Sequence, residues 1–128
     1  MSAPVIGKDP QIGQQLKSLR DQDILIVGSG NIVHNLPKVL WGSNPKPYEW
    51  AIEFDEWVKE KLIGRDFEAL TSHYLDSAAG RLSIPVPDHY FPLLYTLGAV
   101  NNDDKLTFIY EGIQNGSISM RTLSFGLN

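Results

Sequence analysis

Apolar residues recur every three or four positions in several stretches of the chain, which is the spacing of amphipathic helices. Four helices are predicted, over residues 9–20, 48–63, 66–75 and 88–97. Pro10 suits the first turn of the first helix, and Pro92 is compatible with the last helix only in its first turn. Gly64 and Gly98 are expected to end the helices that precede them.

The helix over residues 48–63 has the clearest separation of apolar and charged side chains. Its large apolar residues lie near one face and are Trp50, Phe54, Trp57 and Leu62. Its charged residues occupy the other faces and are Glu49, Glu53, Asp55, Glu56, Lys59 and Lys61. This division predicts that the aromatic face packs against the rest of the protein.

Residues 24–27 form a continuous apolar run, which predicts a central strand covered by helices on both faces. The turn at residues 28–31 then lies at the carboxyl end of that strand, where open α/β sheets usually bind ligands. Alternating patterns at residues 106–110 and 118–120 predict two further strands, with Asn115-Gly116 as a turn signal between them. Residues 83–87 contain two prolines and are expected to be extended. The fold class is therefore α/β, with helices layered on a mixed sheet and a C-terminal antiparallel strand pair.

Composition narrows the possible functions. With 128 residues, 42% of them hydrophobic, the chain is expected to form a single globular domain over residues 1–128. A net charge of -4 disfavours nucleic-acid binding, and no apolar run approaches the length of a membrane span. The N-terminus lacks a basic segment followed by an apolar one, so we expect a cytoplasmic protein. Because there is no cysteine, metal or acid–base chemistry depends on carboxylates and on the histidines His34, His73 and His89.

The segment Gly28-Ser29-Gly30-Asn31-Ile32-Val33-His34 has three interpretations. A dinucleotide-binding fingerprint needs a third glycine where Val33 stands, and a hydrolase elbow needs Gly-x-Ser-x-Gly, so both patterns fit poorly. In the third interpretation, a glycine turn at a strand end lets the backbone approach a ligand closely, with His34 just beyond it.

Prolines on both sides of His89 hold its backbone, which suits an imidazole that must be aimed at a metal. Two histidines and a carboxylate form an iron site with open positions. The spacing of His34 and His89 does not distinguish ligands from histidines with a structural or surface role, and for His73 a structural or surface role is preferred.

Four segments, in order, resemble class III (LigB-type) ring-cleaving dioxygenases of the 4,5-DOPA extradiol kind. Three of them cover residues 24–36, 48–55 and 85–94, and the fourth runs from residues 98–99 to residues 116–120. The resemblance implies a single non-haem ion, Fe(II) or Zn(II), and insertion of O2 beside the two hydroxyls of a catechol. It implies that His34 is the acid–base residue at the metal site and His89 a metal ligand. Asn31 and Asp88 are expected in the surrounding shell or near the substrate.

The resemblance covers only the C-terminal half of the family's domain, and the family carries two further metal-site histidines in the other half. The expected function is therefore the C-terminal portion of an extradiol dioxygenase that acts on a catechol or DOPA-like diol, inactive until the N-terminal portion is supplied. The alternatives are a non-catalytic remnant and a small metal- or ligand-binding module. Because half of a core leaves apolar surface uncovered, we expect a homo-oligomer or a complementing N-terminal half as partner.

Overall fold

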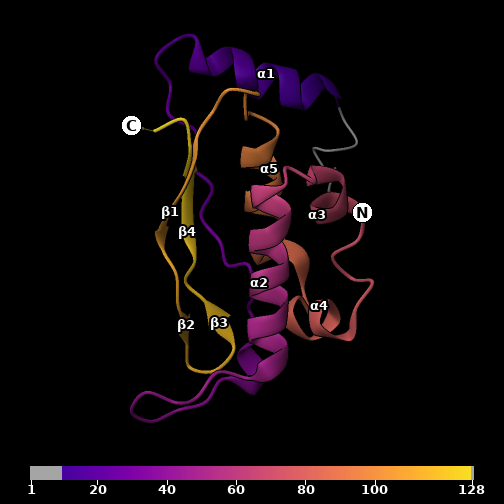
Figure 1. The fold of residues 1–128 in the computed structure, drawn as a ribbon, viewed down its shortest axis with the longest axis vertical. Helices are drawn as coiled ribbons and strands as arrows, with labels where there is room; N and C mark the ends of the chain where they lie inside the picture. The colour runs from indigo at the N-terminus through magenta and orange to yellow at the C-terminus, as the bar shows by residue number, and fades with distance from the viewer. Residues whose placement is uncertain (1–9, 128) are drawn as a thin grey trace.

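A long central helix separates a group of shorter helices from two small antiparallel sheets in the computed structural model, which describes residues 10–127, with side chains from residue 15 (Figure 1). The elements in chain order are α1 (Pro10–Arg20), η2 (Leu36–Lys38), α2 (Glu49–Ile63), α3 (Phe67–Ser72), α4 (Ala78–Ser83), η3 (Pro87–His89), α5 (Phe91–Leu97), β1 (Leu106–Tyr110), β2 (Ile113–Gln114), β3 (Ile118–Ser119) and β4 (Thr122–Phe125). The predicted α/β class is confirmed. Among the described residues, no helix has the length and apolarity needed to cross a membrane.

The longer helices lie close to where the sequence predicts them. The predicted start of α1 at Asp9 lies outside the described residues. Pro92 falls in the first turn of α5, and Gly98 is its C-cap. The helix predicted over residues 66–75 ends earlier, at Ser72, and α4 was not expected. Both short helices begin with a side-chain cap, from Asp66 in α3 and from Ser77 in α4.

The C-terminus of α2 differs in detail from the expected glycine cap. Gly64 is the C-cap but keeps a right-handed φ of -78°. The left-handed residue is Arg65, with a φ of 54°. Its guanidinium donates hydrogen bonds to the backbone carbonyls of Asn101, at 3.1 Å, and Asp104. These bonds offset the cost of a left-handed conformation at a residue with a Cβ atom.

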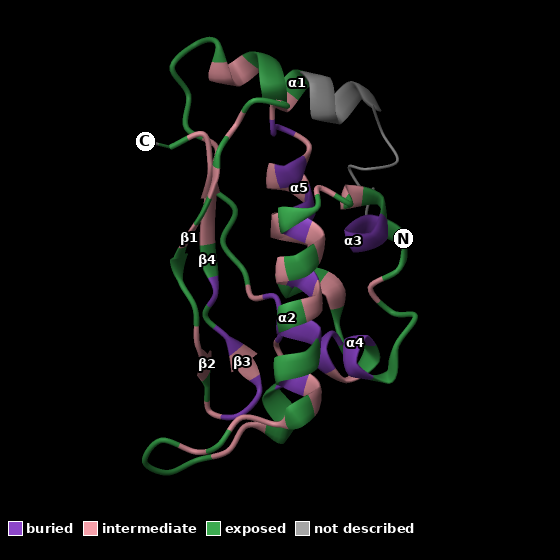
Figure 2. Ribbon diagram, in the orientation of Figure 1, coloured by how far each residue is buried: buried purple, intermediate pink, exposed green. Residues whose placement is uncertain are grey.

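The apolar face of α2 forms the centre of the core. Figure 2 shows buried positions recurring along this helix beside α4 and the β2–β3 hairpin. The buried residues of α2 are Ala51, Phe54, Asp55, Val58 and Leu62, whereas Trp50 and Trp57 are only partly buried at its margin. The placement of Asp55 on a charged outer face was therefore wrong, and its carboxylate is instead buried against Arg121.

The C-terminal strands form two antiparallel pairs. β1 pairs with β4, which was not predicted, and β2 pairs with β3. Asn115 and Gly116, which separate β2 from β3, have φ values of 52° and 74°. These left-handed conformations are the ones that Asn-Gly tolerates best, so the turn signal was correct although the expected pairing was not.

The central strand predicted at residues 24–27 is absent: this stretch is extended but belongs to neither sheet, and in Figure 2 it is largely exposed. Leu25 and Val27 are 63% and 76% exposed. A strand needs hydrogen-bonding neighbours, and the described part of the chain places none beside it. We refer to residues 24–30 as the extended segment.

Candidate active site: a histidine pair beside a glycine turn

Two distant parts of the chain bring His34 and His89 into contact. His34 forms an isolated antiparallel bridge with Ile118, and its backbone N–H donates to the carbonyl of Ser83 at 2.9 Å. His89 is the last residue of η3. The two imidazole rings stack, with centroids 3.7 Å apart and planes inclined by 21°. Both predicted metal-site histidines therefore lie at one location, at the end of the extended segment.

The glycines of the turn make this contact possible. A Cβ atom on Gly30 would lie 2.2 Å from the carbonyl oxygen of His89, and one on Gly28 would lie 2.6 Å from that of Pro92. The next residue, Asn31, donates its backbone N–H to the His89 carbonyl at 2.8 Å. The glycines were expected to let a ligand approach the backbone of the turn closely. In the structure, the segment formed by η3 and α5 makes this close approach and packs directly against the turn.

The two predicted neighbours of the histidines occupy different environments. The amide of Asn31 donates to the carbonyl of Ser119 at 2.9 Å, so this side chain ties the turn to β3. Asp88 is exposed beside His89, and no described residue hydrogen-bonds to its carboxylate. Asn31 therefore has a positioning contact, whereas the carboxylate of Asp88 is open to solvent.

The environment of His34 favours a neutral imidazole. Burial lowers its pKa below the ordinary value because the charged form loses hydration, and the neighbouring His89 lowers it further. A neutral imidazole has a free lone pair, which can accept a proton or bind a metal.

A metal site needs more than this pair. No group of three or more His, Asp or Glu side chains among the described residues could hold an ion. Two imidazoles must also direct their in-plane lone pairs to a common point about 2.0–2.1 Å from each nitrogen. Each lone pair lies in the plane of its own ring, and two planes inclined by only 21° with centroids 3.7 Å apart have no common point that close to both rings. His34 and His89 therefore do not form a complete Fe(II) or Zn(II) site by themselves.

His73 lies apart from the pair, at the C-cap of α3. Its Nδ1 lies 2.8 Å from Asp76 Oδ2 in an exposed contact three residues along the chain. His73 is therefore an exposed residue with a local partner, and its structural or surface role stays a prediction.

A buried ion pair, which the sequence did not predict, is linked to the turn through Ser119. Arg121 donates to both carboxylate oxygens of Asp55, at 3.1 and 2.6 Å, and to Glu111 at 2.7 Å. Ser119 donates its hydroxyl to Asp55 at 2.6 Å, and its carbonyl accepts from Asn31. Burial opposes the charge on Arg121, but the carboxylates raise its pKa overall. No local spacing signals this network, because Asp55 and Arg121 are far apart in the sequence.

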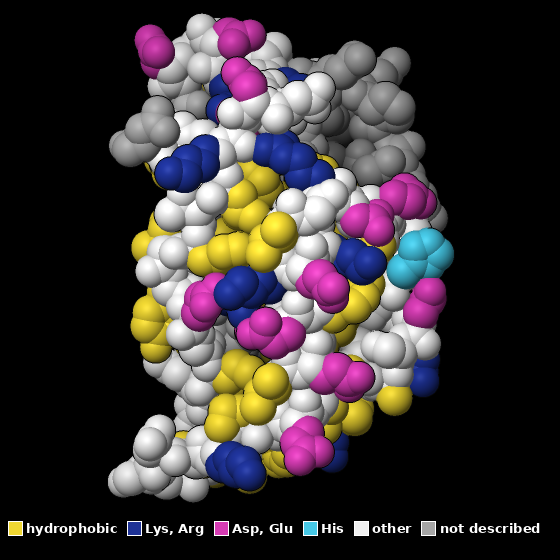
Figure 3. Space-filling model, viewed as in Figure 1, with side chains coloured by type: hydrophobic (Ala, Val, Ile, Leu, Met, Phe, Trp, Pro, Cys, Tyr) yellow, Lys and Arg dark blue, Asp and Glu magenta, His cyan; other side chains and the backbone are white. Residues whose placement is uncertain are grey.

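Acidic and basic side chains intermingle over the face that carries α2, with apolar side chains between them (Figure 3). This mixture accords with the modest net charge of the chain.

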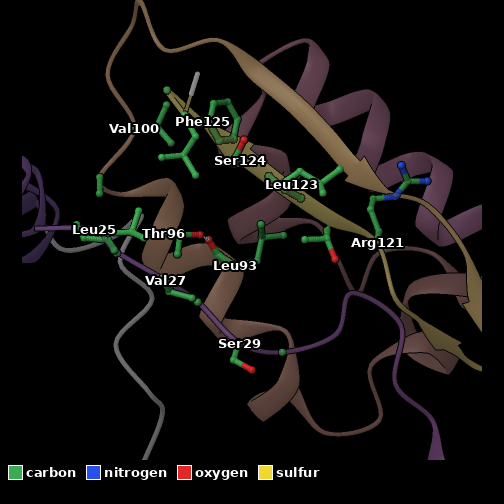
Figure 4. Close-up of a pocket in the computed structure, with 18 of the residues that line it drawn as sticks. Leu25, Val27, Ser29, Leu93, Thr96, Val100, Arg121, Leu123, Ser124 and Phe125 are labelled. Atoms are coloured by element: carbon green, nitrogen blue, oxygen red, sulfur yellow. Dashed lines mark hydrogen bonds between the residues drawn. The ribbon is translucent and has the colours of Figure 1, made fainter.

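An open groove of about 710 Å³ is bordered by His89 and runs between the extended segment and β4. Figure 4 shows Leu25, Val27 and Ser29 along one wall, with Leu123 and Phe125 of β4 along the other. Leu93 and Thr96 of α5 contribute to the lining, and His89 and Asn31 also border it. The groove therefore connects the histidine pair with apolar surface.

Known proteins resemble most of this chain. A crystal structure of an uncharacterized protein from Escherichia coli K12 superposes with a TM-score of 0.82 at 41% identity, over 94% of this chain and 50% of that one. The 4,5-DOPA dioxygenase extradiol of Escherichia coli (strain K12) is 44% identical over 118 residues, covering 91% of this chain and 44% of the relative. A protein of the same name from Beta vulgaris is 29% identical over 118 residues, covering 90% of this chain and 42% of the relative. No family model matches the chain.

The fold and these relatives place the chain in the LigB-type extradiol dioxygenase family. The relatives that identify it carry the name 4,5-DOPA dioxygenase extradiol, and the chain spans less than half the length of the proteins from Escherichia coli and Beta vulgaris.

Proposed function

We propose that this chain supplies one part of the active site of an extradiol ring-opening dioxygenase and turns over only when the rest of the site is added. The contact between His34 and His89, with ring centroids 3.7 Å apart, carries the proposal. It places His34 against His89, which borders the groove, in a chain whose relatives carry the name 4,5-DOPA dioxygenase extradiol.

The proposed role of His34 is to accept a proton from a hydroxyl of an aromatic diol, since its lowered pKa keeps the ring neutral near neutral pH. His89 is the proposed metal ligand, and Asn31 holds the backbone next to it. Fe(II), or Zn(II) in its place, is the proposed single ion. Because the described residues do not complete its site, the ion belongs to the assembled protein.

The test is complementation. The chain is co-expressed with the part of the Escherichia coli relative that it does not align with, and Fe(II), L-DOPA and O2 are supplied. We expect O2 uptake and a yellow ring-opened semialdehyde, with neither polypeptide active alone. His34→Ala and His89→Ala should each lower the rate at least about a hundredfold. His73→Ala, the matched control, should retain activity because His73 lies apart from the pair. A stable complex without ring opening would refute the proposed activity.

The incomplete ligand set favours a second candidate, a non-catalytic remnant, over a small metal-binding module. Elemental analysis of the isolated, untagged chain distinguishes the two. About one metal ion per chain, lost in His89→Ala, supports the binding module. Much less than one ion per chain excludes it.

A further inference from the structure

We propose that the groove between the extended segment and β4 binds a single β-strand from a polypeptide equivalent to the part of the relatives that this chain does not span. The inference rests on the proposed function only for the identity of that polypeptide. The groove itself is defined by unpaired backbone, shape and apolar side chains.

The extended segment forms one wall, and its backbone has no partner within the described structure. From Ile24 to Gly30, no N–H or carbonyl group hydrogen-bonds to another described backbone group. The segment is largely exposed, and an exposed run of unpaired backbone groups is a template for strand pairing.

β4 forms the opposite wall, and among residues 10–127 it pairs with β1 on one side and with no strand on the other. Gly126 donates its N–H to Lys105 at 3.0 Å, toward β1. In antiparallel strands the backbone N–H and carbonyl groups of successive residues point to opposite sides. The backbone groups of Ser124 therefore also point toward β1, whereas those of Leu123 and Phe125 point toward the groove. Two unpaired backbone edges therefore border the same space.

The volume of the groove matches a strand. One strand residue occupies about 4.8 Å between neighbouring strands, about 3.3 Å along the strand and about 10 Å between packed layers, or roughly 160 Å³. The 710 Å³ groove thus holds four to five residues, about the length of β4. A helix could fill space, but its backbone groups bond internally and would leave both edges unpaired.

The outer surface also lacks a cover. Leu25, Val27 and Ile109 border the groove and are 63%, 76% and 61% exposed. Exposed apolar side chains on the extended segment and on β1 suit a partner that adds a strand and covers this face, rather than an isolated peptide.

A second copy of this chain fits the groove poorly. Its own extended segment is held by the close approach of Gly28 and Gly30 to α5 and η3, and its β4 has one free edge rather than two. The relatives, by contrast, contain more than half their length beyond what this chain matches. We therefore assign the strand to that remaining part. Because the groove reaches His89, the strand would end beside the histidine pair.

The experiment uses the full chain and, as the probe, the unmatched part of the Escherichia coli relative. Hydrogen–deuterium exchange is measured on the chain alone and in the purified mixture, with light scattering to give the stoichiometry. We expect a 1:1 complex in which amides of residues 24–30 and of β4 exchange at least about tenfold more slowly. Leu25→Lys with Val27→Lys should weaken the complex at least about tenfold, since the complex would bury the added charges.

Ile63→Lys is the matched control, because Ile63 is 61% exposed on α2 and does not line the groove. It should leave affinity within about twofold of the parent. Three results would each overturn the inference: no complex, a complex with unchanged exchange on both edges, or a homodimer of this chain that protects the groove without the probe. Protection of both edges without ring opening would support strand binding in the groove and refute the proposed activity. Ring opening with unprotected edges would support the activity and refute strand binding in the groove.

Discussion

The contact between the glycine turn and η3 predicts that Gly30→Ala is strongly destabilising. An added Cβ would lie 2.2 Å from the His89 carbonyl oxygen and 3.2 Å from Pro92 Cγ. The nearer atom belongs to the backbone and cannot rotate away, so one of the two segments must move by about 1 Å to restore ordinary van der Waals contact.

The size of the effect follows from two losses. Overpacking of this kind costs about 1–3 kcal/mol. Separation of the segments also weakens the hydrogen bond from Asn31 to His89, worth about 1 kcal/mol. The free energy of unfolding of Gly30→Ala should therefore fall by about 2–4 kcal/mol, as measured by urea denaturation.

Gly64→Ala is the control. A Cβ there lies 3.5 Å from the Glu60 carbonyl, and the backbone is right-handed, so alanine should be neutral or stabilising by up to about 1 kcal/mol. The NMR shifts of the His34 and His89 rings should change in Gly30→Ala, because opening the turn separates the stacked rings. A Gly30→Ala protein as stable as the parent, with unchanged ring shifts, would refute this account of the turn.

Three further predictions concern buried polar groups. Arg121→Met should lower the free energy of unfolding by about 3–5 kcal/mol, because it leaves the Asp55 carboxylate buried without its cation. Adding Asp55→Leu should recover much of that loss. Additive losses of the two substitutions in urea denaturation would contradict this expectation. Tyr90→Phe should cost about 1–2 kcal/mol, since the buried Tyr90 hydroxyl donates to a backbone carbonyl of α3 at 2.7 Å; an unchanged denaturation midpoint would exclude that contribution. The hydrogen bond from Arg20 lowers the pKa of Asp104 below 3.8, so the ionised Asp104 stabilises the fold above that pH, and this stabilisation is lost as pH falls through the folded-state pKa. The difference in free energy of unfolding between the parent and Asp104→Asn should therefore shrink on acidification. A difference that grows would contradict this account.

Elements whose stability is local were predictable from sequence. The apolar stripe of α2, the proline in the first turn of α5 and the Asn115-Gly116 turn each depend on neighbours within a few residues. The location of His34 and His89 at one site followed from the family resemblance rather than from their spacing.

Features that depend on distant partners were not predictable in the same way. Residues 24–27 have the composition of a buried strand, yet strand formation depends on backbone neighbours that the described residues do not provide. Asp55 has the helical position of a surface carboxylate and is buried because Arg121 meets it there. Both differences arise from long-range pairing, which periodicity does not encode.

The groove and the histidine pair share one piece of backbone, and this links the two proposals. The extended segment ends at Asn31, whose backbone bonds to His89 and whose side chain bonds to Ser119. A strand that paired with residues 24–30 would restrict the segment at one end while these bonds restrict it at the other. Any ligand that binds more tightly to the restricted histidine pair must, by reciprocity, tighten the binding of the strand by the same factor. Metal affinity measured with and without the probe polypeptide, and probe affinity measured with and without metal, should therefore change by equal ratios.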